Sequence, residues 1–151
     1  MLTLFHQLLC PHSRYVRLIL GEYGLEARLV DERFWDRREE FLVLNPELLD
    51  LCSAWQMRSV QGVAVPNDHS DPAYDARVLD LFAALDRRAE GVCADLSAAL
   101  PRFRRYRVRL TAALDRARSG ALEHLADSTT SYHAVWFQLH EDLLATLGIP
   151  R

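Results

Sequence analysis

The sequence predicts an α/β region at the N-terminus followed by an all-helical region, in a chain of 151 residues. Residues 1–30 pass from a strand-like to a helix-like and back to a strand-like hydrophobic pattern, which is typical of a β-α-β unit. From Asp71 onward the hydrophobic residues recur at helical spacing, and the breaks between them fall at glycine or proline. The one shift in composition lies near Ser70, so we expect two regions, residues 1–70 and 71–151.

A strand, a tight loop and a helix open the chain. Leu2–His6 has the apolar alternation of a short strand. Pro11 suits the first position of a helix, because its missing N–H costs nothing there. Gly24 is the expected end of that helix. Residues 25–30 alternate again and predict a second strand, parallel to the first because a helix separates the two.

Cys10 stands directly before this helix. Free backbone N–H groups and the positive end of the helix dipole gather at that position, which therefore favours a thiolate or a bound anion. Ser13, one turn further on, is a candidate hydrogen-bond donor to the sulfur. The alternative is that Ser13 only caps the helix and Cys10 is an ordinary loop residue. The loop has no second cysteine, so a monothiol mechanism is expected rather than dithiol cycling.

The rest of the chain is divided by its turn and breaker residues. A charged stretch beginning at Asp36 predicts a short helix that stops at Asn45-Pro46. Val60–Pro66 predicts a strand that ends in the turn Asn67-Asp68. Further helices are expected over residues 72–100, with Gly91 as a candidate interruption, and over residues 102–118 and 132–147.

Composition limits the classes of function. The net charge is −3 and half of the residues are hydrophobic, so neither nucleic acid nor an anionic membrane is indicated as a partner. There is no run of about 18 apolar residues, as a membrane-spanning helix needs, and the N-terminus lacks the pattern of a signal peptide. Three widely spaced cysteines do not resemble a disulfide framework. The expected location is the cytoplasm.

Two further clusters lie in the helical half. Arg102, Arg105 and Arg109 share one helix face, which would suit a phosphate or carboxylate; a solvated helix face is the alternative. His133 and His140 also share a face, and histidines of this kind bind metals in other proteins. Aromatic residues flank both histidines, so we interpret this helix as core or dimer surface and expect no metal.

The opening strand, the Cys-Pro-x-Ser loop and Arg14-x-x-Arg17 resemble the start of a glutathione S-transferase. The similarity continues through Glu32-Arg33-x-Trp35 and through residues 38–46. The resemblance implies a thioredoxin-like N-terminal region, an all-helical C-terminal region and a homodimer. It also implies glutathione as a substrate, either conjugated to a small electrophile or exchanged as a mixed disulfide.

The resemblance assigns site residues as well. Cys10 and Ser13 would be catalytic, and glutathione would be bound by Cys10, Pro11, Val65, Pro66 and Ser70. The family places a Val-Pro-x-Leu strand directly after Asn-Pro, whereas the Val-Pro of this chain lies well downstream and precedes Asn67-Asp68. Phe5 also stands where the family has a tyrosine. The resemblance therefore implies a truncated or atypical transferase architecture. The alternative is a non-catalytic module on a degenerate transferase scaffold that binds a protein partner.

Overall fold

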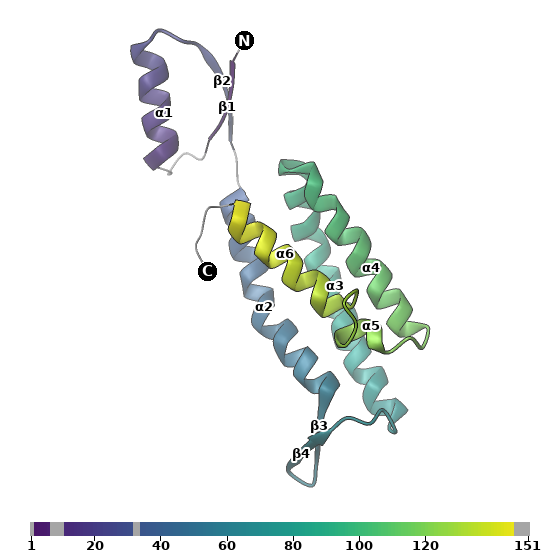
Figure 1. Ribbon diagram of the computed structural model, residues 1–151. Coiled ribbons are helices and arrows are strands. Elements are labelled where there is room, and N and C mark those ends of the chain that lie inside the picture. The colour runs from purple at the N-terminus through teal and green to yellow at the C-terminus, as the bar shows by residue number, and fades with distance from the viewer. Residues whose placement is uncertain (1, 7–10, 32–33, 147–151) are drawn as a thin grey trace. The chain divides into compact units, whose positions relative to one another are not determined.

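The computed structural model describes residues 2–6, 11–31 and 34–146, and the chain divides into two compact units, residues 1–36 and 37–151. The first unit is mixed α/β, and the second is helical apart from one hairpin (Figure 1). The predicted order, a mixed α/β region followed by a helical region, is therefore confirmed. The change of composition near Ser70 falls inside the second unit, where the hairpin gives way to a long helix.

The first unit consists of β1 (Leu2–His6), α1 (Pro11–Glu22) and β2 (Ala27–Asp31). The two strands are parallel, with Leu4 opposite Leu29. Both strands, their orientation and the start of the helix agree with the sequence prediction.

Helix α1 also ends where expected. The N–H of Leu25 donates to the carbonyl of Leu20 over 2.9 Å, and Gly24 between them has a φ of +62°. Glycine adopts this left-handed conformation without the steric penalty that a Cβ would bring. The result is a Schellman-type helix end that returns the chain to β2.

The described strands form two separate two-stranded sheets. β1 pairs with β2, and β3 (Met57–Val60) pairs antiparallel with β4 (Val63–Pro66). The thioredoxin-like sheet implied by the resemblance would join all of these strands, and no such sheet is present among the strands described. The prediction of one strand from Val60 to Pro66 was wrong, because Gln61 and Gly62 both have positive φ and turn the chain back in a tight hairpin.

Helix α2 (Phe34–Gln56) continues past Pro46, so the predicted end of this helix at Asn45-Pro46 was wrong. Proline inside a helix costs about 3 kcal/mol or more locally. Here the buried stripe continues on both sides of the proline, through Phe41 before it and Leu48 after it. Burying these side chains outweighs the local preference, as is usual for helices in folded proteins.

The remaining helices are α3 (Pro72–Ala99), the 3-10 turn η1 (Pro101–Phe103), α4 (Arg104–Arg118), α5 (Glu123–Ala126) and α6 (Tyr132–Thr146). The expected long helices are confirmed, and Gly91 does not interrupt α3. Each of α2, α3, α4 and α6 buries one apolar stripe in a shared core. None of these described helices is both long and apolar enough to cross a membrane.

Asp86 of α3 connects three helices within this core. Arg107 of α4 donates to both of its carboxylate oxygens, over 2.7 and 3.0 Å, and the Tyr132 hydroxyl of α6 donates to it over 2.9 Å. Asp86 is 7% exposed, and the Tyr132 ring packs edge-on against Phe82. A buried charge of this kind is tolerated because every part of it is paired.

We expect Asp86→Ala to lower the free energy of unfolding by about 3 kcal/mol, because Arg107 and Tyr132 lose their shared acceptor. Urea denaturation followed by circular dichroism measures this change. Asp80→Ala, at an exposed position on the same helix, is the control and should stay within about 0.5 kcal/mol of the wild type. Equal effects of the two substitutions would contradict the role of Asp86.

Candidate functional site

The N-terminus of α1 is the predicted reactive position. The helix begins at Pro11 and has no acidic residue in its first turn, so nothing within that turn neutralises its positive end. Ser13 is half-buried, and its carbonyl accepts a hydrogen bond from Arg17 Nε over 3.4 Å. Cys10 lies outside the described residues, as does the loop that carries it.

His6 ends β1 immediately before that loop. It is 8% exposed, and its Nδ1 has no hydrogen-bond partner among the described residues. A buried polar atom without a partner usually costs free energy, so such atoms are uncommon in structural positions. Sequence reasoning did not single out His6, because strand periodicity alone marks it only as an inward-facing residue.

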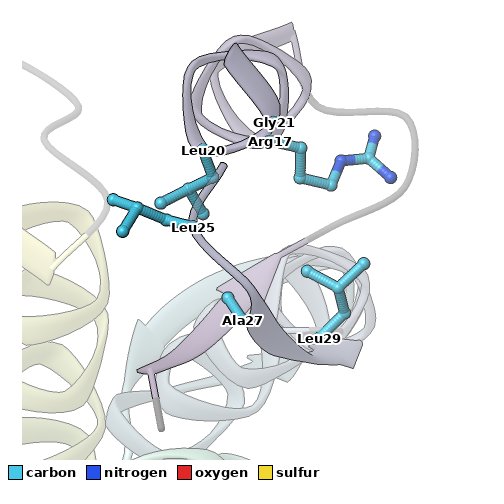
Figure 2. Close-up of a pocket in the computed structure, with 6 residues that line it drawn as sticks. All are labelled: Arg17, Leu20, Gly21, Leu25, Ala27 and Leu29. Carbon is cyan, nitrogen blue, oxygen red and sulfur yellow. The ribbon is translucent and has the colours of Figure 1, made fainter. Parts of the chain in front are cut away.

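A hollow of about 200 Å³ lies between α1 and the β2 segment (Figure 2). It is lined by Arg17, Leu20, Gly21, Leu25, Ala27 and Leu29. The lining is apolar apart from the guanidinium group of Arg17. The hollow belongs to the first unit, and its described lining includes none of Val65, Pro66 and Ser70.

Val65, Pro66 and Ser70, the other predicted glutathione ligands, belong to the second unit. Val65 and Pro66 pair with Arg58 and Met57 in the hairpin, and the Val65–Pro66 peptide bond is trans. The structure therefore places these ligands in a different unit from Ser13.

Ser70 takes part in a local acid–arginine cluster. Its hydroxyl donates to Asp68 Oδ1 over 2.6 Å, and Arg58 Nη2 donates to both Asp68 and Ser70. The hydrogen bonds from Ser70 lower the pKa of the Asp68 carboxyl, with Arg58 adding to the effect. Ser70 thus helps to hold the chain between β4 and α3.

A buried polar network at the start of α3 was missed by sequence reasoning. Asn67 Nδ2 donates to Asp75 Oδ1 over 2.9 Å and to the Trp55 carbonyl over 3.0 Å. His69 Nδ1 lies 3.0 Å from Asp75 Oδ2, and its ring lies 4.6 Å from the Trp55 ring. The network ties the end of α2 to the start of α3. In the sequence this region shows only residues typical of turns, and such residues do not indicate which side chains will hydrogen-bond to one another.

The predicted anion patch is partly occupied by the chain itself. Arg102 and Arg105 both donate to Asp142 of α6, over 3.2 and 3.0 Å, and Tyr106 donates to the same carboxylate over 2.9 Å. Arg109, the third member, is half-buried and has no hydrogen bond or ion pair to another described residue. Arg102 and Arg105 therefore already have a carboxylate partner within the chain, and binding of an external anion at this patch stays a prediction.

His133 and His140 line a groove of about 220 Å³ between α2 and α6. Asn45 Oδ1 accepts a hydrogen bond from Trp136 Nε1 there over 3.1 Å, and Phe41 stacks on Trp136. Within the part of the chain that the structure describes, no three His, Cys, Asp or Glu side chains gather as they would around a metal ion.

Cys52 and Cys93 are buried in the helical unit. Burial raises the pKa of the Cys52 thiol to about 12, with a contribution from Asp127, and burial raises that of Cys93 to about 11. Arg107 lies near Cys93 and acts to lower the pKa of its thiol, but the effect of burial is larger. Both thiols are buried, so neither has the accessible surroundings of a reactive thiol.

No protein-family model matches the chain, and neither a known protein nor a solved structure matches it.

We expect Cys52 and Cys93 to be inert toward a thiol reagent in the folded protein. At about pH 7.5 fewer than about one in a thousand of either thiol is ionised, given pKa values of about 12 and about 11. A timed reaction with Ellman's reagent should therefore show at most one fast thiol per chain, and all three after unfolding in guanidinium. A fast phase that disappears in Cys93→Ala or Cys52→Ala would contradict this assignment.

The same two thiols predict a loss of stability at alkaline pH. Their pKa values are raised in the folded chain from the ordinary value of 9.0. The unfolded chain therefore loses these protons first, and stability that is complete below about pH 8.5 falls as pH rises. We expect the free energy of unfolding to drop by about 2 kcal/mol between about pH 8.5 and pH 10. Urea titrations should show a shallower drop in the Cys52→Ala/Cys93→Ala double variant; an unchanged drop would exclude these thiols as its cause.

Proposed function

We propose that the chain is a glutathione S-transferase-like protein that handles glutathione at the N-terminus of α1, with Cys10 as the thiol-bearing residue. The observation that supports it is the β1–α1–β2 unit with parallel strands, in which the helix begins at the residue after Cys10. This is the arrangement expected for the opening half of a thioredoxin-like domain. Ser13, within the first turn of the helix, would assist as a hydrogen-bond donor.

Two steps are open to such a site. In conjugation, the glutathione thiolate forms a bond to an electrophilic carbon and the displaced electron pair leaves with the leaving group or is protonated by water. In thiol exchange, the Cys10 thiolate attacks a glutathione mixed disulfide, forms a disulfide with glutathione and releases the other thiol. Both steps need a stabilised thiolate, which a helix N-terminus favours.

A second candidate function is a protein-interaction module that keeps the transferase-like opening without catalysis. It is favoured by the position of Val65-Pro66, which lies in a hairpin that pairs only with itself among the described strands. The exposed apolar side chains of the first unit also suit a binding surface.

We expect the protein to form one mixed disulfide with glutathione when incubated with oxidised glutathione, at Cys10, as read by intact mass and peptide mapping. Cys10→Ala should abolish the adduct. Ser13→Ala should slow its formation by about tenfold, because a hydrogen bond to a charged sulfur is worth about 1.5 kcal/mol or more. Cys93→Ala, which removes a buried thiol, is the matched control and should form the adduct at the wild-type rate.

Calorimetry with reduced glutathione separates the two candidate functions. Binding in the millimolar range or tighter, weakened in Cys10→Ala, supports the transferase-like proposal. No binding up to millimolar glutathione, together with no adduct at Cys10, removes that proposal and leaves the interaction module.

A further inference from the structure

The groove between α2 and α6 has the size of a site for a small molecule. Its volume is about 220 Å³, and all of the described residues that line it belong to the second unit. An engineered apolar cavity of about 150 Å³ in another protein holds one benzene molecule. The groove between the two helices therefore has room for a molecule of one or two fused rings.

The walls of the groove are mainly aromatic and aliphatic. Leu48 and Trp136 are buried, and Phe41 stacks on the Trp136 ring with the centroids 4.5 Å apart. Leu49 and Phe137 also line the groove, and they are 49% and 57% exposed. Ring pairs gain free energy beyond the burial of their area, and apolar walls with a few polar groups are typical of ligand sites between helices. These walls favour a flat aromatic ligand.

Two polar side chains in the groove keep hydrogen-bond donors without a partner. Trp136 Nε1 donates to Asn45 Oδ1 over 3.1 Å, which sets the orientation of the amide and leaves Nδ2 as its donor. Neither this Nδ2 nor the ring of His133 has a hydrogen-bond partner among the described residues. A neutral imidazole always carries one N–H, so His133 can donate as well. His133 lies one turn before Trp136 on α6, and hence on the same helix face.

The charges around the groove suit an anion at this end. No Asp or Glu is among the described residues that line it. Glu141 lies outside the lining, with its Oε1 3.8 Å from His140 Nδ1. A carboxylate would therefore be met by the donors of Asn45 and His133 rather than by His140. A cationic ligand would find no charged partner in the lining and would lose its hydration without compensation.

We propose that this groove binds a small aromatic carboxylate. The carboxylate accepts hydrogen bonds from Asn45 Nδ2 and His133, and the ring packs against Trp136 and Phe137. Hydrogen bonds to a charged group are the stronger kind, and two donors match the two oxygens of a carboxylate. The site goes beyond the proposed handling of glutathione, because its described lining includes neither Ser13 nor any of Val65, Pro66 and Ser70.

Calorimetry of the full chain with naphthoate, without glutathione, tests the proposal. We expect one site per chain with a sub-millimolar dissociation constant, which a ligand of this size can reach. Naphthylmethylammonium has the same rings with the opposite charge, and it should not bind measurably. Equal binding of the two compounds would show that the groove does not recognise a carboxylate and would overturn the proposal.

Variants of the lining test the two halves of the site. His133→Leu keeps an apolar side chain of similar size and removes the donor, so it should weaken naphthoate binding by about tenfold or more. Leu49→Trp should prevent binding by filling the groove with a larger side chain. Gln138→Leu is the matched control, because it lies at an exposed position of α6 outside the lining and should bind as the wild type does. Thermal unfolding followed by circular dichroism establishes that each variant is folded.

Nuclear magnetic resonance gives the place of binding. The indole N–H of Trp136 lies in the groove and should shift on addition of naphthoate, whereas that of Trp55, in the network at the start of α3, should not. The proposal is overturned by no binding up to millimolar naphthoate, by unchanged affinity in His133→Leu and Leu49→Trp, by an equal loss in Gln138→Leu, or by a shift at Trp55 alone. Failure of glutathione to bind would leave it untouched, since no glutathione is present.

Discussion

A buried carboxylate, that of Asp86, links three helices of the helical unit. Asp86 accepts from Arg107 and Tyr132 and so joins α3 to α4 and α6. Burial, with the nearby Asp86 charge, raises the pKa of Tyr132 well above its ordinary value, so the hydroxyl keeps the proton that it donates. Asp142 has a parallel role at the surface, where it accepts from Arg102 and Arg105. Acidic side chains thus pair with Arg102, Arg105 and Arg107, whereas Arg104, Arg116 and Arg118 of α4 are exposed.

The first unit differs from the helical unit in its charges and in its apolar side chains. Its helix has no acid in the first turn to balance the dipole, and several of its large apolar side chains are exposed, among them Leu2, Phe5 and Leu29. An unbalanced helix end is an asset for holding an anion or a thiolate. Exposed apolar surface is a cost in free energy unless something covers it. Both features belong to one small β-α-β unit, among whose described side chains no hydrophobic one is buried.

Local signals in the sequence were sufficient for the first unit and for the ends of most helices. The helix end at Gly24, the helix start at Asp71-Pro72 and the start of α6 at Tyr132 all lie where expected, because each depends on residues close by in the chain. Long-range packing decided the rest. Pro46 looked like a helix stop, but the core on both sides of it carries α2 onward. The carboxylate that meets Arg102 lies 40 residues away in the chain, and no spacing rule predicts such a partner.

The residues between β4 and α3 bear on which reaction the proposed site would favour. Asn67 donates hydrogen bonds to Asp75 and to the Trp55 carbonyl, and the Ser70 hydroxyl donates to Asp68. Conjugation needs glutathione to be held along its length, so that its thiolate meets a second substrate in a defined geometry. Thiol exchange needs only a thiolate and access to a disulfide, because the covalent bond itself holds the glutathione. With Ser70, one of the predicted glutathione ligands, engaged by Asp68, the proposed site meets the requirements of exchange more readily than those of conjugation.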